Sequence, residues 1–343
     1  MLPKNPAQPR HNPSSYSISL VVFNGEHDLP ACLNSVAAQY AKPCECVVYD
    51  NNSNDGSMSV IGAHLSRPRL IKGSENIGFG CAHNEIIRST SSEYILILNQ
   101  DAVLEEEYCS ILVEFMDTNP HAGSVSGKIL RVQSLDDIPS TRGIDACGIT
   151  ISLTQHASLT DSGKRAETCE NVHEVFGVPA TCALYRRSAI EDSSLDSANG
   201  KEYFDEDFFM YKEDVDLAYR LRLRGWKSYC VPRAIAYHVR TAKSSCFVLN
   251  RGSKLLRYWS YRNHWYVLIK NIPHNLLMRV GLFIAAYEFA KIIYCVFFEQ
   301  STLAAFADIR KKYSIMRAKR ARISTRTTAD AEEIFTWMND KIF

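Results

Sequence analysis

The N-terminal third of the chain alternates short apolar runs with segments in which apolar residues recur every three or four positions. Leu29, Leu33 and Val36, for example, would share one face of a helix. Strands that alternate with helices predict βαβ units, and therefore an α/β fold with a mostly parallel sheet flanked by helices. The expected strands are 18–23, 46–49, 70–71 and 94–98, and the expected helices are 29–37, 57–65, 78–88 and 105–117.

Polar residues follow each of these four strands. Asn24 follows the first, the run 50–55 ends the second, Asn76 comes after the third, and Asp101 comes after the fourth. In parallel sheets, ligands bind outside the carboxyl ends of the strands. A hydrophobic core needs no polar residues there, so the pattern indicates a binding site at this edge.

A second polar region lies further along the chain, where six acids between 205 and 216 are mixed with Phe, Met and Tyr. Such mixing fits a sugar-binding cleft better than a solvated face. Glu213 and Asp214 open an expected helix that ends at Gly225, and two short strands are expected at 227–231 and 235–238. Acids in a first turn complement the helix dipole, but a catalytic base gains from the same placement.

Three features each leave two interpretations open. The run 50–55 suits the imide edge of a pyrimidine and a ribose hydroxyl, or forms an Asx-rich turn that caps the next helix. Asp101 suits Mg²⁺ or Mn²⁺, or caps the helix near Glu105, although it lies early for a cap. His238 ends a strand and is either a structural histidine or a metal ligand.

Several other classes of protein are excluded or disfavoured. The chain has no GxxxxGK[ST] motif and no GxGxxG motif at the first strand–helix turn, which argues against P-loop kinases and dinucleotide-dependent dehydrogenases. A net charge of +1 gives no reason to expect nucleic acid as a partner. Eleven cysteines without a disulfide-like rhythm predict reduced thiols in a cytoplasmic protein. Cys44 and Cys46 have no second pair at zinc-site spacing, which favours structural cysteines.

Six stretches, taken in order, resemble the glycosyltransferase family 2 enzymes with the GT-A fold, and among them the bacterial O-antigen and cell-wall rhamnosyltransferases. They span roughly 16–240, and the ordered set is specific although each motif alone is loose. They read SLVVFNGEHDLPACLNSV, VVYDNNSNDGS, ENIGFGCAHNEII, YILILNQDAVL, GVPATCALYRRSAI and FDEDFFMYKEDVDLAYRLRLRGWK.

The resemblance implies a role for each matching residue. Asp101 would hold Mg²⁺ or Mn²⁺ against the donor diphosphate, and His238 would be a further metal ligand. Asp214, in the pair with Glu213, would be the general base. The nucleoside contacts would be Phe23, Asn24, Asp50, Asn52 and Asp55, and the remaining donor-site residues Asn76, Gly78, Asn84 and Asn99.

Two departures from the family pattern concern the metal-binding motif. Gln100 stands where proline is usual, and Asn99 stands in place of the first acid, so metal binding would rest mainly on Asp101. The segment before the base is also longer than usual, which we expect to reshape the acceptor side.

The implied reaction is an inverting transfer, and the first expectation is L-rhamnose from dTDP-rhamnose to a hydroxyl of a growing, lipid-linked surface glycan. A UDP-hexose or UDP-galactofuranose transferase of the same family is the alternative donor assignment. A non-catalytic scaffold that binds sugar nucleotide or glycan is the alternative outside enzymes. The sequence leaves homo-oligomerisation open.

The C-terminal part is expected to be helical. We expect a disordered lead-in at 1–15, a catalytic GT-A domain at 16–248 and a helical region at 249–343. The apolar segment 276–298 is interrupted by three charges, which favours an interfacial helix over a spanning one. With basic residues up to 322, it predicts peripheral contact with the inner face of the cell membrane; packing on the catalytic domain or a dimer contact are the alternatives.

Overall fold

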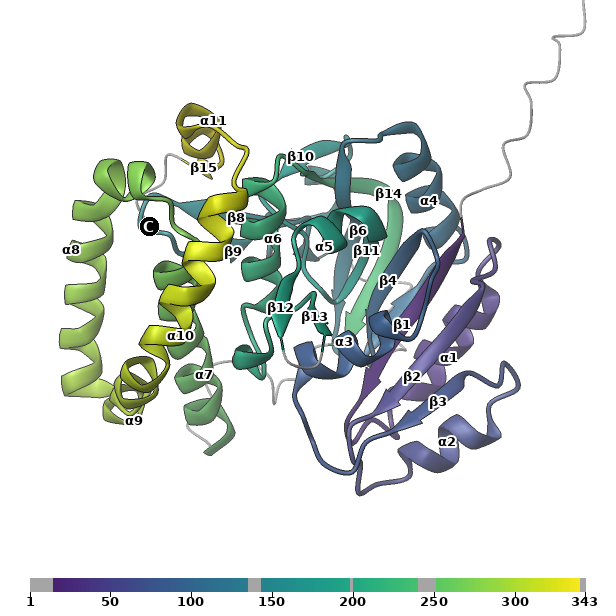
Figure 1. The fold of residues 1–343 in the computed structure, drawn as a ribbon. Helices are drawn as coiled ribbons and strands as arrows, with labels where there is room; N and C mark the ends of the chain where they lie inside the picture. The colour runs from purple at the N-terminus through teal and green to yellow at the C-terminus, as the bar shows by residue number, and fades with distance from the viewer. Residues whose placement is uncertain (1–14, 135–142, 198–199, 240–250, 340–343) are drawn as a thin grey trace, which may run out of the picture.

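The computed structural model describes residues 15–134, 143–197, 200–239 and 251–339. A ten-stranded sheet forms its centre, in the order β10-β14-β6-β11-β4-β1-β2-β3, with β5 added to β14 and β7 to β6 (Figure 1). The lead-in expected at 1–15 lies, apart from Ser15, outside the described residues.

The N-terminal half of the sheet is parallel, as the sequence predicts. Its strands are β1 (Tyr16–Val22), β2 (Glu45–Asp50), β3 (Arg69–Lys72) and β4 (Tyr94–Asn99). The helices that follow them are α1 (Leu29–Ala38), α2 (Ser57–Ala63), α3 (Phe79–Arg88) and, after β5 (Ala102–Leu104), α4 (Tyr108–Thr118).

The other half of the sheet is mixed. β14 (Lys227–Val239) runs parallel to β6 (Ala122–Val132), while β11 (Cys182–Arg186) runs antiparallel between β6 and β4. β7 (Ile144–Ala146) and β10 (His173–Val175) are short antiparallel additions. The remaining elements before the C-terminal helices are β8 (Ile149–Ser152), β9 (Ala157–Leu159), η2 (Ala166–Thr168), α5 (Arg187–Asp192), β12 (Leu195–Ser197), β13 (Gly200–Glu202), η3 (Glu206–Phe208) and α6 (Glu213–Leu223).

Side chains of β4 alternate between two hydrophobic cores. Leu96 and Leu98 pack in the core that contains α1 and α4, whereas Ile95 and Ile97 pack in the core that contains α5 and α6. All four side chains are fully buried. A strand that is apolar on both faces must lie inside a sheet covered by helices on both sides, so β4 is held in the middle of the molecule.

The two strands expected at 227–231 and 235–238 are in fact one strand, β14. Its pairing with β6 shifts register between Val231 and Ile235, where Pro232 has no N–H to give to the ladder. Gly127 on β6 faces this irregularity, and a Cβ there would lie 2.1 Å from the Ala234 carbonyl oxygen. The proline interrupts the hydrogen bonding without ending the strand.

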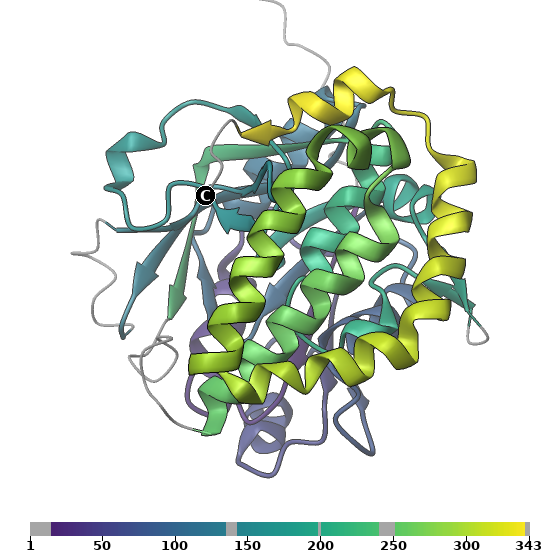
Figure 2. The same cartoon turned by 90° about the vertical axis from the view of Figure 1, so that its left-hand side faces the viewer.

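Among the described residues, five helices and a short strand form the C-terminal region. Figure 2 shows three of the helices, α7, α8 and α10, side by side at one end of the molecule. β15 pairs with β8 of the preceding region, and one hydrophobic core joins α6 to α7, α8 and α10. The bounds are α7 (Arg251–Asn271), α8 (His274–Phe298), α9 (Gln300–Leu303), α10 (Ala305–Arg326), α11 (Ala331–Thr336) and β15 (Met338–Asn339).

Candidate functional site

The loops after β1 and β2 are fastened to each other at the carboxyl edge of the sheet. The Asn24 Oδ1 accepts a hydrogen bond from the Asn54 N–H at 2.8 Å. The Asp55 carboxylate accepts from the Glu26 N–H at 3.0 Å and from the Ser57 N–H at 3.0 Å. Asp55 therefore serves as a turn and helix-start residue in this structure, which is one of its two sequence interpretations.

The neighbouring residues Asp50 and Asn52 complete this turn. The Asp50 carboxylate is buried and accepts from the Ser53 N–H at 3.3 Å. Asn52 has a φ of 63° and is exposed, and Phe23 is 42% exposed beside the loops. Phe23 and Asn52 thus present exposed side chains at the edge where the nucleoside is expected, whereas Asp50 shapes the turn beneath them.

The side chain of Asn51, which the sequence analysis did not single out, joins β2 to the loop after β3. Its Nδ2 donates to Asn76 Oδ1 at 2.9 Å, and its Oδ1 accepts from the Ile77 N–H at 2.9 Å. Gly78 lies in this loop with a φ of 87°, and a Cβ there would lie 2.5 Å from the Phe209 carbonyl oxygen. Only glycine permits this approach, so Gly78 brings the donor-side loop against the segment before α6.

Asn84 lies deeper than a donor contact would require. Its side chain is fully buried, accepts from the Phe204 N–H at 2.9 Å and donates to the Phe204 carbonyl at 2.8 Å. The structure thus uses the Asn84 side chain to fix the chain ahead of η3.

Gln100, which stands where proline is usual in the family, makes defined hydrogen bonds in the structure. Its amide accepts from the Phe23 N–H at 2.9 Å and donates to the Phe23 carbonyl at 3.2 Å. The residue ties the ends of β1 and β4 together. Asn99 is half-buried at the end of β4, and its N–H donates to the Thr181 carbonyl at 2.8 Å.

Asp101 and His238 meet because β5 pairs with β14. The register places His238 opposite Ala102, so the His238 Nε2 lies 3.4 Å from Asp101 Oδ2. On its other side, His238 Nδ1 contacts Asp145 Oδ2 at 2.8 Å, and Asp145 is itself bonded to Arg131. Burial lowers the pKa of His238, but the hydrogen bonds and charges of the two aspartates outweigh it and raise that pKa to about 9.

This arrangement fits a divalent cation. Asp101 Oδ1 is buried and has no hydrogen-bond partner among the described residues, although buried carboxylate oxygens are normally satisfied. A histidine whose second ring nitrogen is held by a carboxylate is the usual form of a metal-binding histidine. Asp145 supplies that carboxylate, and sequence reasoning missed it because it lies 93 residues from His238.

The acid-rich stretch 205–216 divides into two sets. Asp205, Asp207 and Asp216 are paired with lysines or arginines, chiefly Lys270 and Lys319 of the C-terminal helices, and Glu206 is paired with Arg88. Within the described residues, Glu213 and Asp214 form no such ion pair. Most of the acids are therefore structural, and the structure leaves the Glu–Asp pair free to act in chemistry.

Asp214 is anchored by backbone N–H groups. Its Oδ1 accepts from the Val215 N–H at 2.8 Å, and the Ala180 N–H also donates to it. The next residue, Thr181, accepts from the Asn99 N–H. Ala180 thus contacts the candidate base, and its neighbour Thr181 contacts the motif that carries Asp101. These two adjacent residues, just before β11, bring the two parts of the site together.

Both acids of this pair are harder to ionise than usual. Burial raises the pKa of Glu213 to about 8, with a further contribution from the charge of Asp214. Burial also raises the pKa of Asp214, although its backbone hydrogen bonds oppose the shift. An acid with a raised pKa is a better proton acceptor once ionised, which suits a general base.

The loop before α6 has a strained backbone, and side chains of the C-terminal region hold it in place. Phe209, Tyr211 and Lys212 have φ values of 59°, 68° and 65°. The buried Asn263 on α7 donates from its Nδ2 to the carbonyls of Phe208 at 2.9 Å, Met210 at 2.8 Å and Tyr211 at 2.7 Å.

Arg262, the neighbour of Asn263, supports the same loop by donating to the carbonyls of Asp207 at 2.8 Å and Phe208 at 3.0 Å. Its guanidinium lies 4.1 Å from the centre of the Trp259 ring, which stacks on Phe209. Left-handed backbone at non-glycine residues persists only when its surroundings enforce it. We call these contacts of Arg262 and Asn263 the α7 clamp.

A mostly parallel α/β sheet flanked by helices is the architecture of GT-A glycosyltransferases. Solved structures share the fold. The mannosyltransferase PcManGT from Pyrobaculum calidifontis, in complex with GDP-Man and Mn²⁺, aligns with a TM-score of 0.51 at 16% identity over 91% of this chain and 86% of its own. GalNAc-T7 with UDP, GalNAc and Mn²⁺ gives a TM-score of 0.58 at 12% identity over 76% and 48%.

The chain belongs to glycosyl transferase family 2, whose model matches residues 17–193, and it is a glycosyltransferase. It is 28% identical over 241 residues to the N-acetylglucosaminyl-diphospho-decaprenol L-rhamnosyltransferase of Mycobacterium tuberculosis (strain CDC 1551 / Oshkosh), covering 64% of this chain and 74% of that protein. It is 24% identical over 221 residues to the poly-beta-1,6-N-acetyl-D-glucosamine synthase of Staphylococcus aureus (strain COL), covering 64% of this chain and 48% of that protein.

Proposed function

We propose that the protein transfers a sugar with inversion from a nucleoside diphosphate donor to a hydroxyl acceptor, with a divalent cation bound. The observation that carries this proposal is the free Glu–Asp pair at the start of α6, in a stretch whose other acids are mostly neutralised by lysines and arginines. A scaffold that only binds nucleotide or glycan would have no need for a carboxyl pair that is left without a close ion-pair partner among the described residues.

In the proposed reaction, Asp214 accepts the proton of the acceptor hydroxyl. The hydroxyl oxygen then bonds to the anomeric carbon as the bond from that carbon to the diphosphate oxygen breaks, so one displacement inverts the configuration. Asp101 and His238 would hold the cation, with Asp145 fixing the imidazole. A bound Mg²⁺ or Mn²⁺ would neutralise charge that builds on the leaving diphosphate.

For the donor we propose dTDP-L-rhamnose, and for the acceptor a lipid-linked diphosphosugar. The support is the 28% identity to a relative whose name states L-rhamnose transfer to N-acetylglucosaminyl-diphospho-decaprenol. Phe23 and Asn52 would contact the nucleoside, together with Asn24 and Asn76 of the neighbouring loops.

The test measures nucleoside diphosphate release from dTDP- and UDP-sugars, with membrane lipid extract as the source of acceptor. Each reaction is run with Mn²⁺, with EDTA and with the Asp214→Asn variant. We expect release from dTDP-rhamnose only, with loss of at least about 100-fold in the variant. Donor binding without release under all conditions would favour the scaffold, and release that survives Asp214→Asn would reject the assigned base.

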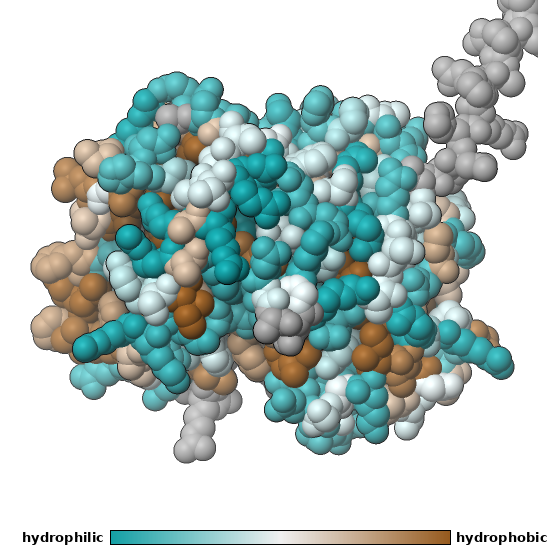
Figure 3. All heavy atoms as spheres, viewed as in Figure 1, coloured by the Kyte–Doolittle hydropathy of each residue, from teal (hydrophilic) through white to brown (hydrophobic). Residues whose placement is uncertain are grey.

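The membrane contact is a further part of this proposal, and it rests on α8. By length and composition α8 is apolar enough to cross a membrane, with a hydropathy of 1.8 and 22% of its apolar window buried. Of the three charged residues of α8, Glu288 points inward, and its carboxylate lies 2.8 Å from His264 on α7. Figure 3 shows brown, hydrophobic surface on the side where α8 lies in Figure 1, and Met278 and Leu282 there are 75% and 82% exposed.

We propose that α8 lies in the lipid interface at the inner face of the membrane. The basic run of α10 contributes less to this than the sequence suggested. Lys312 and Lys319 are bound to acids of the catalytic region, and Arg320 donates to the Ile269 carbonyl. Exposed apolar side chains of α8 would therefore supply most of the affinity for a bilayer.

A further inference from the structure

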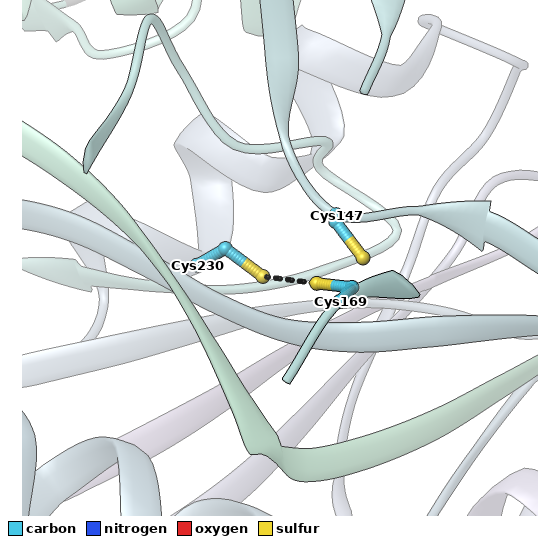
Figure 4. Close-up of side chains that lie close together, drawn as sticks. All are labelled: Cys147, Cys169 and Cys230. Atoms are coloured by element: carbon cyan, nitrogen blue, oxygen red, sulfur yellow. Dashed lines mark hydrogen bonds between the residues drawn. The ribbon is translucent and has the colours of Figure 1, made fainter. Parts of the chain in front are cut away.

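Three cysteines that are far apart in the sequence lie close together, on segments that include those of Asp145 and His238. Cys147 follows β7, Cys169 follows η2, and Cys230 lies within β14 (Figure 4). All three are buried, and their sulfur atoms lie within 4.8 Å of one another. The Sγ atoms of Cys169 and Cys230 are 3.9 Å apart.

These separations match a metal site better than a disulfide. A disulfide requires a sulfur–sulfur distance of about 2.05 Å. Sulfur ligands bound at about 2.3 Å to one tetrahedral ion lie about 3.8 Å from each other. The sulfurs of Cys169 and Cys230 are close to that spacing without any movement of the backbone.

A histidine is available on the same face of the sheet. His173 on β10 pairs directly with Cys230 on β14, and cross-strand partners project to the same side. It follows Cys169 by four positions, a spacing within the range of short zinc-ligand pairs. Its Nδ1 contacts the Asn171 carbonyl at 2.9 Å, and the side chain is only half-buried, so it is able to rotate toward the sulfurs.

The charge around the cluster also suits a bound cation with thiolate ligands. The Lys128 ammonium donates to the carbonyls of Ala166 and Cys169, both at 3.1 Å. Three thiolates and a doubly charged ion have a net charge of −1, which this ammonium offsets.

We propose that Cys147, Cys169, Cys230 and His173 bind a structural zinc ion, separate from the catalytic cation site. Thiolate and imidazole ligands select zinc over the hard cations Mg²⁺ and Mn²⁺. The ion would tie together the segments that carry Asp145 and His238, because Cys147 lies two residues after Asp145 and Cys230 is on the strand of His238. It would act as a brace for the site and take no part in the transfer reaction.

The test uses the full chain produced with zinc and, separately, with Co²⁺ as a spectroscopic probe. We expect about one thiolate-bound ion per chain, counted separately from any ion at the Asp101 and His238 site, with visible bands of tetrahedral thiolate-bound Co²⁺ that Zn²⁺ displaces and Mn²⁺ does not. Cys169→Ala and Cys230→Ala should weaken binding at least about 100-fold and His173→Ala about tenfold. Cys109→Ala, a buried free cysteine on α4, is the matched control and should bind normally.

Alkylation mapping of the wild-type chain guards against variants that fail to fold. Bound zinc should protect Cys147, Cys169 and Cys230 from alkylation under mild denaturation. Protection of the more exposed pair Cys44 and Cys46 instead, or absence of tetrahedral Co²⁺ bands, would overturn the proposal. Unchanged affinity in His173→Ala would overturn the assignment of zinc in favour of a three-coordinate thiophilic cation such as Cu(I).

Discussion

Replacing Asn263 with alanine removes three hydrogen bonds from the loop that leads into the candidate base. The two N–H groups of the Asn263 amide are shared among the Phe208, Met210 and Tyr211 carbonyls, and a buried group left without its partner costs about 1–3 kcal/mol, so the total loss is ~2–4 kcal/mol. The loop also contains three non-glycine residues with positive φ, each costing about 1–2 kcal/mol. Without the α7 clamp, we expect the loop to relax and to carry Asp214 out of position.

The consequence for catalysis follows from the same numbers. A change of ~2–4 kcal/mol corresponds to about 30- to 1,000-fold in the population of the ordered loop. In the wild type the ordered loop is more stable than the relaxed one, so part of the lost free energy only narrows this difference. We therefore expect kcat to fall about 10- to 100-fold. The donor KM should change less than kcat, because Phe23 and Asn52 lie on loops that Asn263 does not contact, and the relaxed loop reaches the donor side only where Phe209 meets Gly78.

The assay compares kcat, donor KM and Tm for Asn263→Ala and for a matched control, Asn271→Ala. Asn271 is equally buried on α7 but donates to Asp216 of α6 at 2.7 Å. We expect both variants to lower Tm by a few degrees, and only Asn263→Ala to lower kcat. If the two variants lose stability alike and both keep full kcat, the clamp is structural and the reasoning about the loop is wrong.

Three further predictions concern other parts of the molecule. The pKa of Glu213 is raised from about 4.5 to about 8 in the folded chain, so its ionisation destabilises the fold progressively as the pH rises through that window. The Tm of Glu213→Gln should therefore rise relative to that of the wild type between pH 5 and pH 9. A Tm difference that stays constant with pH would contradict this. Asp145→Asn should weaken Mn²⁺ binding about 10- to 100-fold in titration calorimetry, and unchanged affinity would show that Asp145 does not support the metal ligand. Met278→Glu with Leu282→Glu should lower co-sedimentation with anionic vesicles at least about tenfold, whereas Leu65→Glu, an exposed leucine after α2, should not; equal losses would reject α8 as the lipid-facing surface.

The role of the C-terminal helices extends beyond the division into two regions at residue 248 that the sequence suggested. The α7 clamp, the lysines that neutralise Asp205 and Asp207, and the pairing of β15 with β8 all cross that boundary. We therefore expect a chain truncated after β14 to lose the ordered loop before Asp214, in addition to any membrane contact.

The sequence by itself determined the parts that depend on local periodicity. Alternating strands and helices gave the parallel half of the sheet, and parallel strands bring their carboxyl ends to one edge, so Asn24, Asp101 and their neighbours had to gather there. The six family stretches, over roughly 16–240, likewise predicted the glycosyltransferase family, which the family model confirms over residues 17–193. These features are encoded within short stretches of chain.

Tertiary structure decided which polar residues remain available for chemistry. Six acids crowd one stretch, and the sequence could not tell that lysines from α7 and α10 neutralise some of them and leave Glu213 and Asp214 free. Asp145, Asn263 and the pair of Cys169 and Cys230 are likewise recognised only by partners 52 to 93 residues away. Hydrogen-bond and ion-pair partners at such separations are set by strand register and helix packing, which leave no local pattern in the sequence.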